Sequence, residues 1–192
     1  MNEIYGLTST PNGKDFNLSS GAWIGPIEIS EAEHKVLKNI ISMYTNPITI
    51  MEIGVFRNGK NSFTETILNT KLNDSIYLGI DLDDKSVLNN DIKHIYTLRV
   101  NSFDQNTVRN KLKELNINTL NILLIDGDHS IEGCVNDWKY VDMLSNDGTV
   151  IIHDTSSHVG PREFVKFIDK NIFDVTIYNN GSDNGITTAK KI

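Results

Sequence analysis

Two apolar segments in the second half of the chain each end in acidic residues and histidines. Their ends read IDGDHS and IIHDT. Carboxylate oxygens and imidazole nitrogens bind divalent ions such as Mg²⁺ and Mn²⁺. Asp126, His153 and Asp154 are therefore candidate ligands of a divalent metal ion. His129 titrates near neutral pH when unperturbed, so it is a candidate base that takes a proton from a substrate hydroxyl.

A structural role would also explain these residues. Asp126 or Asp128 could cap the helix that follows them, and His153 could be a hydrogen-bonded residue at the end of a strand. We favour the metal site, because carboxylates and imidazoles at adjacent strand ends otherwise lack compensation. Cys134 is the only cysteine, so the sequence predicts neither a cysteine-rich zinc site nor an intramolecular disulfide.

A glycine-containing segment could hold a nucleotide-like cofactor. The sequence EIGVFRNGKNS begins at Glu52 and contains Gly54 and Gly59. Glycines let the backbone approach a ligand, and the following helix offers unpaired N–H groups to a carboxylate or phosphate. Asp81 ends the next predicted strand, 27 residues after Gly54, which is near the spacing at which an acidic residue binds ribose hydroxyls. The alternatives are a tight turn for the loop and a helix cap for Asp81.

These residues need strands that end side by side, and the hydrophobic pattern predicts such strands. Apolar runs alternate with helical patterns, which is typical of parallel strands covered by helices on both faces. An antiparallel hairpin follows, so we expect a Rossmann-like, doubly wound, mostly parallel seven-stranded α/β sheet. Ser30, Ser62 and Ser102 each precede Glu or Gln by three residues, which predicts capping boxes. Predicted strands cover residues 48–53, 76–80, 92–98, 120–125, 149–153, 175–178 and 186–189; predicted helices cover 31–45, 62–70, 84–90, a segment beginning near 102, 131–145 and 161–171.

One domain, residues 30–192, accounts for this pattern. Residues 1–29 are rich in Gly, Ser, Thr, Asn and Pro, and we expect an irregular arm, either a poorly ordered terminus or a lid over the site. His158, Arg162 and Lys166 follow the fifth strand and could contact a substrate, but an exposed polar surface explains them equally well.

The composition limits the classes of molecule that the protein is expected to bind. The 192 residues include 18 Lys and Arg against 25 Asp and Glu, a net charge of −7, with no basic stripe for nucleic acid. No apolar run could span a membrane, and the first residues do not resemble a signal peptide. We expect a small-molecule substrate, no nucleic acid or membrane partner, and a cytoplasmic location. The oligomeric state is open, a homo-oligomer included.

Taken together, these segments resemble the class I S-adenosylmethionine-dependent methyltransferases. The resemblance is to the small metal-dependent O-methyltransferase branch, methyltransferase family 24, which includes macrocin and rhamnosyl O-methyltransferases. It runs from about Ile27 to the C-terminus. Its most specific part is ILLIDGDHSIEGCVNDWKYVDMLSNDGTVIIHDT, residues 122–155.

The resemblance implies a role for each candidate residue. Glu52, Gly54 and Gly59 would hold the methionine part of S-adenosylmethionine, Asp81 its ribose, and the turn around Ser102 would lie near the adenine. Asp126, His153 and Asp154 match the family's metal-ligand positions, with Asp126 beside the cofactor as well. His129 matches the base proposed for the macrolide-sugar enzymes.

Two departures from the family pattern affect these expectations. The glycine loop is one residue longer than the usual E-I-G-x-x-x-G-x-S. His153 stands where relatives have Asp or Glu, which would weaken Mg²⁺ binding and favour Mn²⁺ or another transition ion.

The resemblance implies metal-assisted methyl transfer to a hydroxyl of a small molecule, with a sugar favoured by analogy. The alternatives are a nicotinamide-binding protein, although its G-x-G-x-x-G motif is absent, and a non-catalytic protein that keeps the fold.

Overall fold

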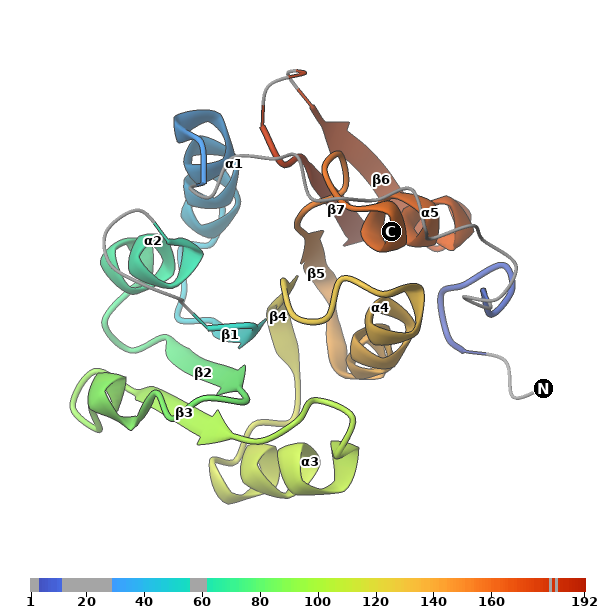
Figure 1. Cartoon of the computed structure of the whole chain (residues 1–192). Coiled ribbons are helices and arrows are strands. Elements are labelled where there is room, and N and C mark those ends of the chain that lie inside the picture. Colours follow the sequence, from blue (N-terminus) through green and yellow to red (C-terminus); the bar gives the residue numbers. More distant parts are fainter. Residues whose placement is uncertain (1–3, 12–28, 56–61, 180, 182) are drawn as a thin grey trace.

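A seven-stranded sheet forms the centre of the protein in a computed structural model, which describes residues 4–11, 29–55, 62–179, 181 and 183–192. The strand order is β3-β2-β1-β4-β5-β7-β6. Strands β1 to β5 run parallel, and β7 is antiparallel to both β5 and β6 (Figure 1). The predicted doubly wound sheet with an antiparallel C-terminal hairpin is confirmed. The strands are β1 Thr49–Ile53, β2 Ile76–Asp81, β3 Ile95–Arg99, β4 Leu120–Ile125, β5 Leu144–Ile152, β6 Phe173–Tyr178 and β7 Ile186–Lys191.

In the described part of the chain, five α-helices cover the two faces of this sheet. Side chains of α1 and α2 pack with Ile50 and Leu124 on one face, whereas α3, α4 and α5 pack with Met51 and Leu123 on the other (Figure 1). Neighbouring residues of a strand point to opposite faces, so a strand buried on both faces is apolar throughout. The helices are α1 Glu31–Ser42, α2 Phe63–Thr70, α3 Gln105–Glu114, α4 Ile131–Trp138 and α5 Val159–Phe164, with 3₁₀ turns η3 Ser86–Leu88, η4 Lys139–Met143 and η5 Val165–Phe167.

Local signals fix where the helices begin. Ser30 and Glu33 form the predicted capping box of α1, and the Ser62 hydroxyl accepts the Glu65 N–H at α2. The capping box predicted at Ser102 is wrong, because Asp104 caps α3 by accepting the Thr107 N–H. A carboxylate directly before the helix competes successfully with a serine two residues earlier.

Two predicted boundaries on the β3 side are also wrong. The helix predicted for 84–90 is the single turn η3, and β3 starts at Ile95 instead of residue 92. Asn90 and Ile95 exchange backbone hydrogen bonds across a tight turn. Ile92 lies in this turn and is 92% exposed, so it is an apolar residue outside the core.

Helices α4 and α5 are shorter than predicted. Helix α4 ends at Trp138, and η4 leads into β5, which begins at Leu144 instead of 149 because an irregular register lets Leu144 pair with Leu120. Helix α5 begins at Val159 and ends at Phe164, where η5 replaces the predicted continuation to 171.

The described part of the N-terminal arm, residues 4–11, packs far from the strand ends that carry the candidate site. The Trp138 indole donates to the Tyr5 carbonyl at 2.9 Å, and Leu7 bridges to Ile168. Gly6 lies against Phe173, at the start of β6, beside the end of β7 and the amino end of parallel strand β5. The expected lid would involve residues 12–28, which lie outside the described residues. None of the described helices has the length and apolar character of a membrane span.

Candidate functional site

The carboxyl ends of β1 and β4 meet at the centre of the sheet, where the strand order reverses. The Asp126 N–H donates to the Ile53 carbonyl at 2.9 Å. Gly54 has φ +90°, and a Cβ there would lie 2.0 Å from the Asp126 carbonyl oxygen, so only glycine fits this close approach. Ligands of open α/β sheets bind at this kind of switch point. The fold therefore places Gly54 and Asp126 where a cofactor is expected.

The three predicted metal ligands lie together at the ends of β4 and β5. Asp126 Oδ1 is 3.0 Å from His153 Nδ1, and Asp154 Oδ1 is 3.7 Å from the same nitrogen. Ligand atoms of the three residues all lie within 4.8 Å of one another. His153 and Asp154 are buried, whereas Asp126 is partly exposed. Asp126 is therefore the most solvent-accessible of the three candidate ligands.

Glu33 joins this group from helix α1, although in the sequence it is recognisable only as part of a capping box. Its Oε2 accepts the Ser30 N–H at 2.7 Å, and its Oε1 lies 3.3 Å from His153 Nε2. The carboxylate is 2% exposed. Metal-binding histidines usually donate their second ring nitrogen to a carboxylate or carbonyl, which leaves the first nitrogen free for the ion. The neighbouring carboxylates raise the pKa of His153, so the ring is charged without an ion. When an ion displaces the Nδ1 proton, Glu33 favours the tautomer that keeps the proton on Nε2 and leaves Nδ1 facing Asp126 and Asp154.

His129 lies next to the same carboxylates. Its Nε2 is 2.8 Å from Asp154 Oδ2 and 3.7 Å from Asp126 Oδ1. Burial disfavours the charged ring, but the two carboxylates outweigh burial and raise the pKa of His129 to about 9. Burial likewise opposes ionisation of Asp126, but the charges and hydrogen bonds of His153 and His129 together outweigh it and lower the Asp126 pKa.

Asp154 has a strained backbone. Its φ is +60°, the left-handed region that residues other than glycine adopt rarely. The His158 N–H donates to the Asp154 carbonyl at 3.0 Å and closes a turn between them. Strained residues of this kind cluster at functional sites, and this one holds both carboxylate oxygens toward histidines.

The residues predicted to bind the cofactor are found in different settings. Asp81, at the end of β2, accepts the Val55 N–H at 2.9 Å and the Asp83 N–H at 2.7 Å. A carboxylate has about four acceptor positions, so it can also bind hydroxyls. Ser102 is half-buried after β3, and its carbonyl accepts the Tyr140 hydroxyl. Gly59 lies outside the described residues.

Glu52 points into the core beneath α1 and α2, and it is 1% exposed. The hydroxyls of Thr64 and Tyr77 donate to its Oε2. Burial raises the pKa of Glu52 to about 8, although these hydrogen bonds oppose the shift. Direct contact between Glu52 and the cofactor stays a prediction, and in this conformation the carboxyl group faces core residues.

The raised pKa of Glu52 makes stability depend on pH. Between about pH 4.5 and 8 the unfolded chain loses the Glu52 proton while the native protein keeps it, so the free energy of unfolding falls as pH rises. Glu52→Gln should remove about 3 kcal/mol of this decline between pH 5 and pH 8. Urea unfolding at both pH values measures it, with the exposed Glu132→Gln as control. If the free energy of unfolding falls equally between pH 5 and pH 8 in the parent, Glu52→Gln and Glu132→Gln, Glu52 is ionised in the native state.

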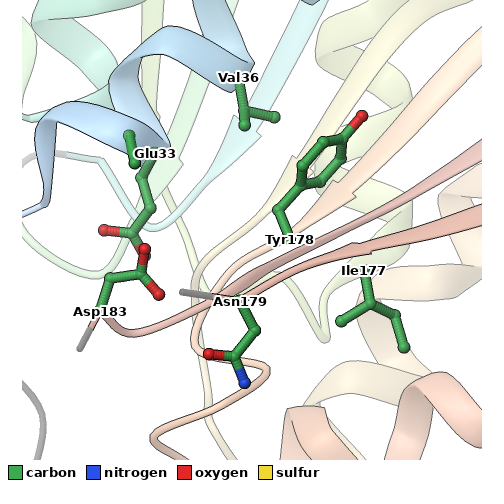
Figure 2. A pocket seen from close by; sticks show the side chains of 7 residues that line it. Glu33, Val36, Ile177, Tyr178, Asn179 and Asp183 are labelled. Atoms are coloured by element: carbon green, nitrogen blue, oxygen red, sulfur yellow. The ribbon is translucent and has the colours of Figure 1, made fainter. Parts of the chain in front are cut away.

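A cavity of about 350 Å³ lies between α1 and the end of the β6–β7 hairpin. Figure 2 shows the carboxylates of Glu33 and Asp183 facing each other on one wall, with Val36 and Tyr178 nearby. The cavity has polar groups and an aromatic ring, as pockets for small molecules do. Because Glu33 contacts His153, this cavity borders the group of candidate metal ligands.

Comparison with known proteins finds structural neighbours only. No family model and no curated protein matches the chain. MycE methyltransferase of the mycinamycin pathway, solved with Mg, SAH (S-adenosylhomocysteine) and mycinamycin VI, has a TM-score of 0.60 at 13% identity over 82% of this chain and 48% of that chain. The chain thus spans about half the length of MycE.

Two neighbours match over nearly their whole length. A protein of Clostridium thermocellum described as an rRNA methylase has a TM-score of 0.60 at 14% identity, over 86% of this chain and 100% of that one. SMU.1697c of Streptococcus mutans, described as a methyltransferase and bound to SAH, has a TM-score of 0.55 at 12% identity, over 82% and 95%. The chain shares its fold with methyltransferases. At these identities the likeness establishes the fold alone.

Proposed function

We propose that this protein is an S-adenosylmethionine-dependent methyltransferase that uses a divalent metal ion and methylates a hydroxyl of a small molecule. The observation that carries the proposal is the group of Asp126, His129, His153 and Asp154 at the ends of β4 and β5, beside the switch point of a methyltransferase fold. MycE, which has this fold, was crystallised with Mg and SAH. We also propose that the protein belongs to the metal-dependent O-methyltransferase branch.

The cofactor would lie across the ends of β1 and β2. Gly54 lets the backbone turn without a side chain at the switch point, and Asp81 offers its remaining acceptor positions to ribose hydroxyls. The Asp81 carboxylate also holds the Val55 N–H, so the same side chain shapes the loop and binds the ligand. Ser102 would lie at the adenine end.

The residues present fit a divalent ion. Asp126 Oδ1, His153 Nδ1 and Asp154 Oδ1 are an oxygen and nitrogen donor set, and Glu33 fixes the tautomer of His153. The nitrogen donor favours Mn²⁺ or another transition ion over Mg²⁺. The cofactor supplies an electrophilic methyl group, and a bound ion lowers the pKa of the acceptor hydroxyl and orients its oxygen.

His129 would accept the proton of the hydroxyl at Nε2. Asp154 Oδ2, 2.8 Å from this nitrogen, stabilises the charged ring after the transfer. The two carboxylates hold a proton on His129 up to about pH 9 when their charge is not offset. The base is therefore available at neutral pH only when another positive charge offsets them, which couples proton transfer to a loaded metal site.

The acceptor would enter from the cavity between α1 and the hairpin. Tyr178, Asn179 and Asp183 line this cavity and offer hydrogen bonds, for example to a sugar hydroxyl. The net charge of −7 argues against nucleic acid as the acceptor.

Calorimetric titration of the purified chain with SAH and with NAD tests the proposal. We expect saturable binding of SAH and none of NAD, because the loop after β1 lacks G-x-G-x-x-G. Mass spectrometry of a metabolite pool incubated with methyl-labelled cofactor then identifies the acceptor. Binding of NAD without SAH would instead support a nicotinamide-dependent protein, and binding of neither would support a non-catalytic one.

A further inference from the structure

Asp154 presents its two carboxylate oxygens to two different groups of side chains. Oδ1 faces His153 Nδ1 at 3.7 Å, on the side of Asp126. Oδ2 lies 2.8 Å from His129 Nε2 and 3.5 Å from His158 Nδ1. His158 has no role in the proposed methyl transfer. The second group therefore contains a histidine that the proposed reaction does not explain.

The spacing of the second group suits a small tetrahedral ion. Zinc–nitrogen and zinc–oxygen bonds of about 2.1 Å place tetrahedral ligand atoms about 3.4 Å apart. The distances of 2.8 and 3.5 Å from Asp154 Oδ2 lie on either side of that value. One ligand atom from each of His129, Asp154 and His158 lies within 4.8 Å of the other two. Two imidazoles and one carboxylate, with a fourth position for water, are a donor set that Zn²⁺ favours.

The ring nitrogen of His129 lacks a properly directed partner. Nε2 is buried and lies 2.8 Å from Asp154 Oδ2, but among the described residues no partner meets the geometry of a hydrogen bond to it. A buried polar atom without a partner is costly, and native proteins usually satisfy it with water or an ion. An ion beside Asp154 Oδ2 would satisfy this nitrogen.

The backbone holds both histidines in place. A Cβ on Gly160 would lie 2.0 Å from the His129 carbonyl oxygen, so the start of α5 packs directly on the loop that carries His129. The rings of His129 and His158 lie 4.1 Å apart between centroids. The Ser157 hydroxyl donates to Asp154 Oδ1 at 3.0 Å and so orients the carboxylate, with Oδ2 toward the histidines. His129 and His158 lie in the loops that lead into α4 and α5, and His158 Nδ1 is also 3.0 Å from the Ser157 hydroxyl, which an ion would replace as its partner.

We propose that His129, Asp154 Oδ2 and His158 form a second metal site, which takes a borderline ion such as Zn²⁺. The first site uses Asp154 Oδ1 with Asp126 and His153. The second site uses Asp154 Oδ2 with His129 and His158. One consequence rests on the proposed function: because His129 is the proton acceptor there, an ion bound to its Nε2 takes up the lone pair that the reaction needs. Zinc at the second site therefore inhibits methyl transfer.

Zinc titration of the untagged chain tests the site without any assay of activity. We expect saturable Zn²⁺ binding that His158→Gln weakens at least about 10-fold, the effect of losing one neutral ligand. Co²⁺ in place of Zn²⁺ should give the visible absorption of a four-coordinate ion, and His158→Gln should change that spectrum. His158→Asn is the second variant if Gln impairs folding. The site is refuted if both variants bind Zn²⁺ as the parent does.

His94→Asn is the matched control. His94 lies in the turn before β3, at the opposite edge of the sheet, with φ +52°, which Asn tolerates. We expect its Zn²⁺ affinity to equal that of the parent. Equal losses in His94→Asn and His158→Gln would mean nonspecific binding by surface histidines and would overturn the proposal.

Inhibition separates this proposal from the proposed function. Zn²⁺ added to the Mn²⁺-loaded protein should slow methyl transfer, and about 10-fold more Zn²⁺ should be needed in His158→Gln. If SAH fails to bind while zinc binding depends on His158, the proposed function is wrong and the second site stands. If SAH binds and zinc binding ignores His158, the second site alone is wrong.

Discussion

Asp154→Asn is expected to abolish methyl transfer and to weaken Mn²⁺ binding by at least about 100-fold, because it removes the negative charge and one of the two carboxylate oxygens from the proposed metal site. The substitution should leave the backbone in place, since Asn tolerates the left-handed conformation found at φ +60°. Asp126→Asn should have the same effect. Calorimetric titration with Mn²⁺ and turnover with labelled cofactor measure the two losses.

Asp128→Asn is the matched control for this pair. Asp128 belongs to the same loop, but its Oδ1 accepts the Ser130 N–H at 2.9 Å, a bond that an amide oxygen also accepts. We expect Mn²⁺ affinity and turnover close to those of the parent protein. If Asp154→Asn keeps parental Mn²⁺ affinity, the ligand assignment fails even if turnover falls.

Asp81→Ala is expected to weaken SAH binding by at least about 30-fold. Hydrogen bonds to a charged group contribute about 1.5–3 kcal/mol each, and the change removes those to ribose as well as those that hold Val55 and Asp83. Titration with SAH at fixed pH measures the loss. Asp81→Asn separates the two effects, because its amide oxygen can still accept one backbone N–H.

Asp83→Ala controls for the charge of this turn. Asp83 is exposed, and among the described residues its carboxylate has one ion pair, a long contact of 3.7 Å with Lys85. Its backbone N–H donates to Asp81, and this bond survives the substitution. We expect SAH affinity within about two-fold of the parent. Unchanged binding in Asp81→Ala would remove Asp81 from the cofactor site and place the ribose elsewhere.

The strands and the group at their ends were predictable from the sequence for a physical reason. Strands buried on both faces are apolar throughout, so a polar residue such as Asp126 or His153 marks where a strand leaves the core. Parallel strands then bring these marks to one edge of the sheet. Short apolar segments and local capping patterns were less informative. Ile92 is apolar but lies in an exposed turn. Asp104, and not Ser102, caps α3.

Contacts between distant segments were not predictable. Glu33 lies 120 residues from His153, and its place in a capping box already explained it. His158 was indistinguishable from a surface histidine until the turn after β5 placed it beside Asp154. Which nitrogen of His153 faces the carboxylates depends on Glu33 as well. Sequence periodicity reports which face a residue occupies, whereas ring orientation depends on partners from other elements.

Glu33 belongs both to the wall of the cavity and to the hydrogen bond that fixes His153. Any molecule that pulls this carboxylate toward the cavity weakens its bond to Nε2 and makes the imidazole a poorer electron donor. Occupancy of the cavity and of the proposed metal site would then be thermodynamically linked, and the linkage would be reciprocal. A loaded ion should change the affinity for an acceptor by the same factor as the acceptor changes the affinity for the ion.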